Sequence, residues 1–188
     1  MSHQPEPLDV ESLCAAVEAG LAAKMVFFWG HTGKQGMLGN ECFSQWFAAP
    51  FVVGVKRYPT AEHFMMAEKA RLFGDERTAE RILASEHPAQ VKKLGREVEG
   101  FDELKWQAQR FQIVAAGSFA KFSQNPELEA HLLATGARVL VEASPTDCVW
   151  GIGLAANDAA ARDPRHWRGL NLLGFALMHA RAALSAGR

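Results

Sequence analysis

The sequence predicts a mainly α-helical fold with a few short β-strands, an α+β class, in one compact domain. Two observations lead to this class. Apolar residues recur at helical spacing through most of the chain after residue 60. Short runs of β-branched and aromatic residues, bounded by glycine or proline, occur at only a few places. The length of 188 residues fits a single domain.

The composition is that of an ordinary globular protein, with 48% hydrophobic and 22% charged residues. A net charge of −1 lacks the basic excess of proteins that grip a nucleic-acid backbone, so strong nucleic-acid binding is not expected. The three cysteines are widely spaced, which predicts neither a disulfide framework nor a zinc pair. No secretion signal is evident, and no apolar stretch reaches the roughly 18 residues that span a bilayer. We therefore expect a cytoplasmic protein without membrane contact.

The first 24 residues are expected to form a loose tail and a short helix, ahead of a main domain over residues 25–188. The helix is predicted over residues 9–23, because four apolar residues fall on one face. These residues are Val10, Leu13, Val17 and Leu21.

Short strands are predicted next. Residues 25–29 are apolar and predict a strand, whereas residues 30–42 are punctuated by glycine and predict a loop. Residues 51–53 and 55–58, divided by Gly54, predict a hairpin.

Helices dominate from Pro59 onward, and Thr60 is a suitable N-cap for the first of them. The expected elements are helices over about 61–73, 76–84, 88–95, 102–125 and from 126, a strand over 139–142, and a last helix over about 170–184. Five apolar residues of the longest helix recur at helical spacing and are expected to face the core: Leu104, Ala108, Phe111, Ala115 and Phe122. In the last helix the inward residues are expected to be Leu173, Leu177 and Leu184.

Several kinds of catalytic site find no support in the sequence. The glycine-rich segment 30–36 fails the phosphate-loop pattern, because Gln35 follows the lysine where serine or threonine is required. The seven histidines are scattered without metal-ligand spacing, and no Gly-x-Ser-x-Gly elbow is present. No metal and no cofactor are therefore expected.

Glu62 falls in the first turn of a predicted helix, where the helix dipole favours a carboxylate. At helical spacing it shares one face with Met66, Lys69 and Phe73. A carboxylate and an ammonium group beside apolar residues are suited to a polar ligand. Spacing alone nevertheless favours a structural or solvated pair.

The loop from Pro145 to Gly153 concentrates polar, aromatic and glycine residues in a segment that is poor helix and poor strand. Asp147 lies three residues before Trp150, and the glycines that follow, Gly151 among them, allow a ligand to approach the backbone. The alternative is a capped turn, in which the aspartate accepts local backbone hydrogen bonds.

Two further residues have both a structural and a binding interpretation. Trp106 lies off the main apolar stripe of the long helix, on the side of Arg110 and Ile113, and is either a core residue of a second face or a stacking surface for a flat ring. Asn171 lies at the start of the last helix, where capping is the usual role and an anion site is the alternative.

Taken in order, these segments resemble the NADAR family, also called the YbiA-like family, over roughly residues 26–184. No single motif is specific, but their number, order and spacing are. The matching segments are residues 36–40 with 43–44, residues 58–70 and 93–96, Trp106, residues 121–122 and 142–145, Asp147 with residues 150–154, and residues 167–174.

The resemblance implies a mostly helical enzyme that cleaves N-glycosidic bonds without a metal or redox cofactor. The implied substrates are small and nucleotide-like, namely the ribose-phosphate-bearing aminopyrimidines of the riboflavin pathway. Relatives linked to ADP-ribose imply two alternatives. One is a hydrolase that removes ADP-ribose from guanine in DNA or nucleotides, and the other is a module that binds ADP-ribose without cleaving it.

The resemblance also implies roles for individual residues. Glu62 is expected to be the catalytic glutamate, and Asp147 a second polar group at the reacting bond. The implied substrate-binding residues are Asn40, Lys69, Arg96, Trp106, Trp150, Gly151 and Asn171, with the tryptophans stacking on the ring and Lys69 and Arg96 contacting phosphate. Two departures from the family pattern, Glu41 after Asn40 and Ser118 after Gly117, bear on the choice of substrate more than on the reaction.

Overall fold

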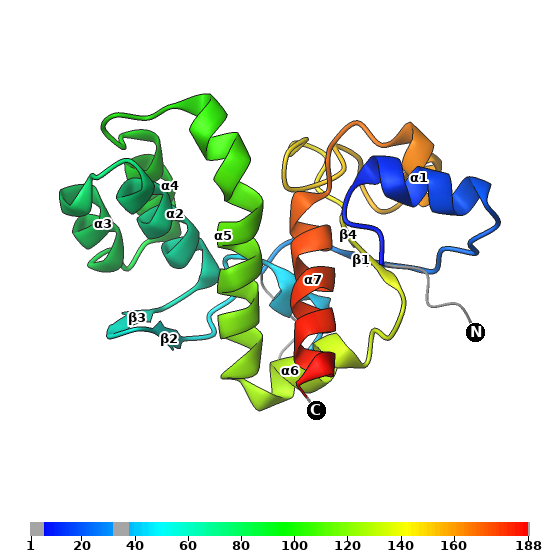
Figure 1. The fold of residues 1–188 in the computed structure, drawn as a ribbon, viewed down its shortest axis with the longest axis horizontal. Coiled ribbons are helices and arrows are strands. Elements are labelled where there is room, and N and C mark those ends of the chain that lie inside the picture. Colours follow the sequence, from blue (N-terminus) through cyan, green and yellow to red (C-terminus); the bar gives the residue numbers. More distant parts are fainter. Residues whose placement is uncertain (1–5, 32–37, 188) are drawn as a thin grey trace.

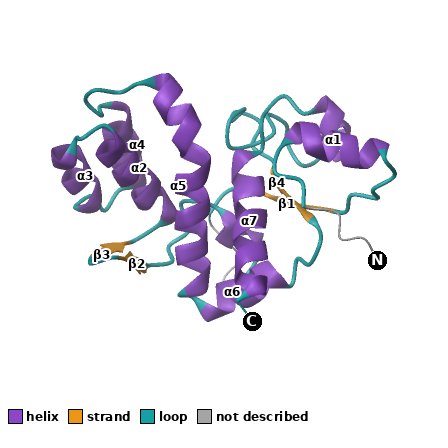
Figure 2. Cartoon of the chain, in the orientation of Figure 1, coloured by secondary structure: helices purple, strands orange, loops and turns teal. Residues whose placement is uncertain are grey.

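The computed structural model describes residues 6–31 and 38–187, which form a mostly helical molecule (Figure 1). The α-helices are α1 (Val10–Glu18), α2 (Ala61–Leu72), α3 (Glu76–Leu83), α4 (Pro88–Arg96), α5 (Glu103–Ser123), α6 (Pro126–Leu133) and α7 (Leu172–Ala186). The strands are β1 (Met25–Phe28), β2 (Phe51–Val53), β3 (Lys56–Tyr58) and β4 (Val139–Glu142). Short 3₁₀ helices cover Asn40–Phe43, Ala159–Arg162 and Pro164–His166. The predicted α+β class with a few short strands is confirmed (Figure 2).

The strands form two separate pairs. β1 and β4 run parallel, from Met25 opposite Val139 to Phe28 opposite Glu142. β2 and β3 form the predicted antiparallel hairpin. Because parallel strands end at the same edge, the segments that follow Phe28 and Glu142 leave the sheet together.

Helix α5 passes through the middle of the molecule and connects two groups of buried side chains (Figure 1). On one side it packs against α7, and on the other against α2. The larger group lies around β1, β4 and α7 and includes Leu140 and Phe175. The smaller group lies among α2, α3 and α4 and includes Ala70 and Ile82. Leu13 of α1 is fully buried in the larger group, so the first helix packs on the same core.

Local signals account for most helix boundaries. Thr60 caps α2 by accepting a hydrogen bond from the N–H of His63 at 3.3 Å, as predicted. The first helix ends at Glu18, earlier than predicted, and Gly20 follows with a φ of +100°. Helix α7 begins at Leu172 rather than near Leu170, because Asn171 adopts a left-handed φ of +51°.

The predicted core face of α5 is wrong in its first two turns. Leu104 is 78% exposed and Ala108 is also exposed, whereas Trp106 is buried. The inward face of these turns is instead that of Trp106, which belongs to the larger buried group and borders a pocket. Further along the helix, Ala115 and Phe122 are buried as predicted. The three predicted leucines of α7 are buried as well.

Within the described part of the chain, none of the helices combines the length and the apolar character that crossing a bilayer demands.

Candidate active site

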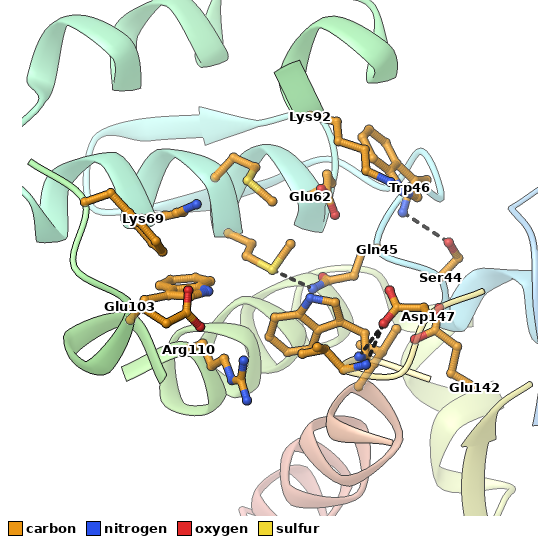
Figure 3. A pocket seen from close by; sticks show the side chains of 17 residues that line it. Ser44, Gln45, Trp46, Glu62, Lys69, Lys92, Glu103, Arg110, Glu142 and Asp147 are labelled. Carbon is orange, nitrogen blue, oxygen red and sulfur yellow. Dashed lines mark hydrogen bonds between the residues drawn. The ribbon is translucent and has the colours of Figure 1, made fainter. Parts of the chain in front are cut away.

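A cavity of about 400 Å³ lies where α2, the start of α5, the end of β4 and three loop segments meet, with one residue each from α4 and α7 (Figure 3). Its acidic lining residues are Glu62, Glu103, Glu142 and Asp147. Its basic lining residues are Lys69, Lys92 and Arg110. Aromatic rings come from Trp46, Phe101, Trp106 and Trp150, and the remaining lining residues include Ser44, Gln45, Met65 and Met66. The cavity therefore combines ionisable groups of both signs with flat rings.

Glu62 lies in the first turn of α2 and is only 5% exposed. Its N–H donates to the carbonyl of Gln45 at 3.0 Å, which ties the start of the helix to the loop that forms the pocket wall. Met66 and Lys69 follow it along the lining, so most of the predicted stripe faces the cavity. Burial raises the pKa of the Glu62 carboxyl to about 8; the nearby Lys92 opposes this and Asp147 adds to it. A carboxyl with this pKa holds its proton at neutral pH.

Asp147 combines the two roles that the sequence left open. Its Oδ1 accepts hydrogen bonds from the N–H groups of Val149 and Trp150, both at 2.8 Å, which is the capped turn. The same side chain lines the cavity. Among residues 6–31 and 38–187, no donor bonds Oδ2 of Asp147. The turn therefore fixes a carboxylate at the cavity surface with one oxygen available.

Position 151 requires glycine because neighbouring backbone leaves no room for a Cβ atom. A Cβ at this position would lie 2.8 Å from the carbonyl oxygen of Glu142 and 3.0 Å from that of Asp147. The residue is buried and does not border the cavity, so it supports the turn from behind.

Glu142, the last residue of β4, is an acidic group of the site that sequence analysis did not assign. Burial raises the pKa of its carboxyl to about 8, and the neighbouring Asp147 and Glu62 add to the effect. Its Oε2 is buried and has no hydrogen-bond partner within the described chain. Asp147 thus raises the pKa of both glutamates, and Glu62 raises that of Glu142, although the three acids come from separate segments.

The other end of the pocket is aromatic and basic. Figure 3 shows Lys69, Glu103 and Arg110 on one side of the cavity, across from Asp147 and Glu142. The ammonium nitrogen of Lys69 lies 4.3 Å from the centre of the Phe101 ring and 5.6 Å from that of Trp106. It also donates to the carbonyl of Gly95 at 2.8 Å. Burial lowers the pKa of Lys69, and Glu103 partly offsets this.

Besides Gly151, three predicted binding residues lie outside the cavity lining. Arg96 is exposed at the end of α4. Asn40 donates from Nδ2 to the carbonyl of Phe27 at 3.2 Å, and its Oδ1 lies 3.1 Å from a ring nitrogen of His131. Asn171 is completely buried and does not cap α7 through its side chain.

The side chain of Asn171 instead bonds to β4. Its Nδ2 donates to the carbonyl of Leu140, and its Oδ1 accepts from the N–H of Glu142, both at 2.9 Å. The interpretation of this residue as an ordinary helix cap is wrong, because its amide satisfies the open edge of a buried strand.

Metal binding has no support in the part of the chain that the structure describes, where no group of three or more histidine, cysteine or acidic side chains is placed to hold an ion. The glycine-rich segment 30–36 falls mostly outside the described residues.

Comparisons with known proteins place this chain in a family. A model of the NADAR domain matches residues 27–185. The chain belongs to the NADAR family. An N-glycosidase of Acanthamoeba polyphaga mimivirus is 42% identical over 163 residues, which cover 84% of this chain and 95% of the relative. A riboflavin biosynthesis protein of Vibrio vulnificus is 31% identical over 142 residues, which cover 76% of this chain and 36% of that protein.

The N-glycosidase YbiA of Escherichia coli matches this NADAR chain in both sequence and structure. Its sequence is 34% identical over 143 residues, covering 76% of this chain and 81% of YbiA. The NMR structure of YbiA matches with a TM-score of 0.70 at 29% identity, covering 89% of this chain and 88% of that one. The family resemblance and the predicted fold are confirmed, and the chain is a member of an N-glycosidase family.

The residues of the NADAR pocket that the sequence left unassigned differ in how they could have been found. Glu142 ends a strand of three apolar residues just before a loop, which is a recognisable position for a ligand-binding acid. Arg110 lies one helical turn after Trp106 on the same side of α5. Trp46 and Lys92 carry no such signal, because only the tertiary fold brings residues 44–46 and α4 to the cavity.

Proposed function

We propose that this NADAR protein hydrolyses the N-glycosidic bond between a phosphorylated ribose and an aminopyrimidine of the riboflavin-pathway type. The observation that carries the proposal is that buried acids, flat rings and cations meet in one cavity. The names of the relatives add support, since two are N-glycosidases and one is a riboflavin biosynthesis protein.

Glu62 is the proposed proton donor and, once it is deprotonated, the stabilising carboxylate. In a ribosylaminopyrimidine the bond that breaks joins the anomeric carbon of the sugar to nitrogen. As that bond breaks, the proton of Glu62 moves to the departing nitrogen, and the bonding electron pair leaves with it. The carboxylate that remains faces the positive charge left on the sugar. Water then adds to the anomeric carbon and returns a proton to Glu62, so the cycle closes without a cofactor.

The rest of the cavity is proposed to orient the substrate. Asp147 holds the sugar or assists the departing base, and its turn keeps it fixed for that purpose. Trp106 and Trp150 offer flat surfaces for the heterocycle. For the phosphate, Lys69 and Arg110 replace the sequence-based pair of Lys69 and Arg96, because Arg110 lines the cavity and Arg96 does not.

A second candidate substrate is an ADP-ribosylated guanine. Trp46 at the rim near Lys92 provides a further aromatic surface, which suits a ligand that carries a second ring (Figure 3). A module that binds ADP-ribose without cleaving it is less consistent with a site that contains two buried glutamates of raised pKa.

A substrate panel separates these candidates. The protein is incubated with ribosylaminopyrimidine phosphates, ADP-ribose and ADP-ribosylated guanosine, and the products are identified by mass spectrometry. We expect free aminopyrimidine and ribose 5-phosphate from the first class. Release of guanine nucleoside from the last substrate alone would favour the second candidate, and recovery of every compound intact would exclude hydrolysis.

A further inference from the structure

Glu142 is fixed in place by its main chain. Its N–H donates to Oδ1 of Asn171 at 2.9 Å, and its carbonyl accepts from the N–H of Ile152 at 2.9 Å. The next residue, Ala143, donates to the carbonyl of Phe28 at 2.9 Å. These bonds determine where the side chain of Glu142 leaves the strand, at the wall of the cavity that it lines (Figure 3).

The side chain of Glu142 lacks the hydrogen-bond partner that a buried acid with a purely structural role normally has. Its Oε2 is buried, and no donor contacts it within residues 6–31 and 38–187. Buried polar atoms are nearly always paired, since an unpaired one has lost its hydration without replacement. By contrast, the partly buried Glu68 bonds to Tyr58 and to Arg71. An unpaired oxygen at a cavity wall indicates a group that is completed by a ligand.

The charged groups around Glu142 favour its protonated form, which can both donate and accept a hydrogen bond. The ionisable groups that share its cavity are the acids Glu62, Glu103 and Asp147 and the cations Lys69, Lys92 and Arg110. Burial and the two nearest acids raise the pKa of Glu142 to about 8, so it is protonated at neutral pH. A protonated carboxyl offers one O–H donor and retains acceptor oxygens.

This chemistry matches a sugar hydroxyl better than it matches a phosphate or a ring. A hydroxyl donates and accepts at once, as Glu142 does, whereas a phosphate requires cations. The cations Lys69 and Arg110 lie away from Glu142 and Asp147 (Figure 3). The ring of Trp106 is centred 5.6 Å from the ammonium nitrogen of Lys69. Since Oδ2 of Asp147 also has no bonded donor in the described chain, two neighbouring carboxyl groups have free oxygens. Adjacent hydroxyls of a ribose present the matching pair.

We propose that Glu142 and Asp147 form the sugar subsite of this pocket, in which Glu142 binds the 2-hydroxyl, one of the two adjacent hydroxyls of a ribose phosphate. The inference rests on the proposed function, which requires a ribose phosphate in the cavity. Glu142 is then a binding residue that orients the anomeric carbon toward Glu62, and the neighbouring Asp147 binds the second hydroxyl.

Binding of two product-like sugars tests the subsite independently of turnover. Ribose 5-phosphate and 2-deoxyribose 5-phosphate are titrated into the full chain by calorimetry. The wild type is expected to prefer the ribose compound by about tenfold, the usual effect of one hydrogen bond to a buried polar group. In Glu142→Leu and Glu142→Asp the preference falls below about threefold. Glu142→Gln keeps it, because the amide retains a donor and an acceptor.

A matched control removes an acid from the opposite end of the same cavity. Glu103→Leu is expected to change the affinity for both sugars alike, and so to leave the preference unchanged. Circular dichroism establishes folding, and Glu142→Asp decides the matter if Glu142→Leu does not fold. A wild type without preference, or a folded Glu142→Asp that keeps the tenfold preference, would overturn the subsite. Neither result touches the proposed hydrolysis, which release of the base measures separately.

Discussion

At the scale of single residues, the proposed chemistry depends on acidic side chains that the fold holds away from water. Glu62 is 5% exposed, and its pKa of about 8 has burial as its largest cause. A residue in this state keeps its proton at neutral pH and can deliver it when a C–N bond breaks. The neighbouring Asp147 stays fixed by two backbone hydrogen bonds at 2.8 Å.

The protonated state of Glu62 predicts a descending limb in the pH profile. Because the proposed reaction begins with the neutral acid, kcat/KM should fall as pH rises through about 8. The limb does not belong to Glu62 alone, since the pKa of Glu142 is also about 8 and Glu62 is one of the groups that raise it. Steady-state rates between pH 6 and 10, corrected for folded fraction, would show it. Activity that instead rises to a plateau above pH 8 would assign Glu62 the role of a standing carboxylate.

At the scale of elements, buried side chains hold the loops of the site in place. Lys121 of α5 is 1% exposed, and its ammonium group donates to the carbonyls of Cys42 at 2.6 Å and Ser44 at 2.9 Å. The loop so anchored carries Gln45 and Trp46 into the cavity. Asn171 performs the corresponding task for β4 on the opposite wall.

Replacing Lys121 by methionine should therefore weaken both the fold and the site. Methionine fills the space but leaves two carbonyls without a donor, so we expect a loss of roughly 1–3 kcal/mol in the free energy of unfolding. The KM should rise more than kcat falls, because the wall residues lose their position. Urea denaturation and kinetics measure the two effects, with Lys93→Met on the exposed face of α4 as control. Unchanged stability and KM would show that the loop holds without the lysine.

A pair of substitutions at Asn171 separates hydrogen bonding from backbone strain. Asn171→Ala loses both bonds to β4 and places Ala at a φ of +51°, which should cost roughly 3 kcal/mol of stability. Asn171→Gly loses the same bonds but tolerates the φ, so it should be the more stable variant by about 1 kcal/mol. Thermal unfolding provides the comparison, and equal stabilities would mean that the left-handed φ contributes no strain.

Comparing Thr60 with Asn171 shows which structural roles can be predicted from the sequence and which cannot. Thr60 acts within its own turn, so a local pattern was enough to predict it. Asn171 bonds to a strand about 30 positions earlier, and no local pattern encodes that choice. The site divides in the same way. Helical spacing alone predicts that Glu62, Met66 and Lys69 share one face of α2. That this face shares a cavity with Glu142, at the end of β4, depends on the tertiary fold and could not be predicted from local spacing.

At the scale of the whole molecule, the pocket lies where the two buried groups of side chains adjoin, with α5 between them. α2 contributes Glu62 from one side, and β4 with its following loop contributes Glu142 and Asp147 from the other. The fold thereby buries acidic side chains together in a cavity, where they contribute little to the free energy of unfolding. A site of this kind is maintained at the expense of stability.

The stability cost of Glu62 should depend on pH with a definite sign. Its pKa is about 8 in the folded chain, against an ordinary value of 4.5, so between these limits the folded state binds more protons. The wild type therefore loses stability relative to Glu62→Gln as pH rises from about 5 to 8. We expect the variant to gain on the order of 1–3 kcal/mol over that range. Urea denaturation of both proteins at pH 5, 6.5 and 8 measures the difference, and a constant difference would place Glu62 in contact with water.

The most direct measurement compares release of the aminopyrimidine by the wild type and by Glu62→Gln. Glutamine keeps the size and a hydrogen-bond donor but cannot deliver a proton. We expect kcat to fall by roughly 10²–10⁴-fold while the variant stays folded. Near-normal turnover by folded Glu62→Gln would contradict the assignment of the chemistry to this residue.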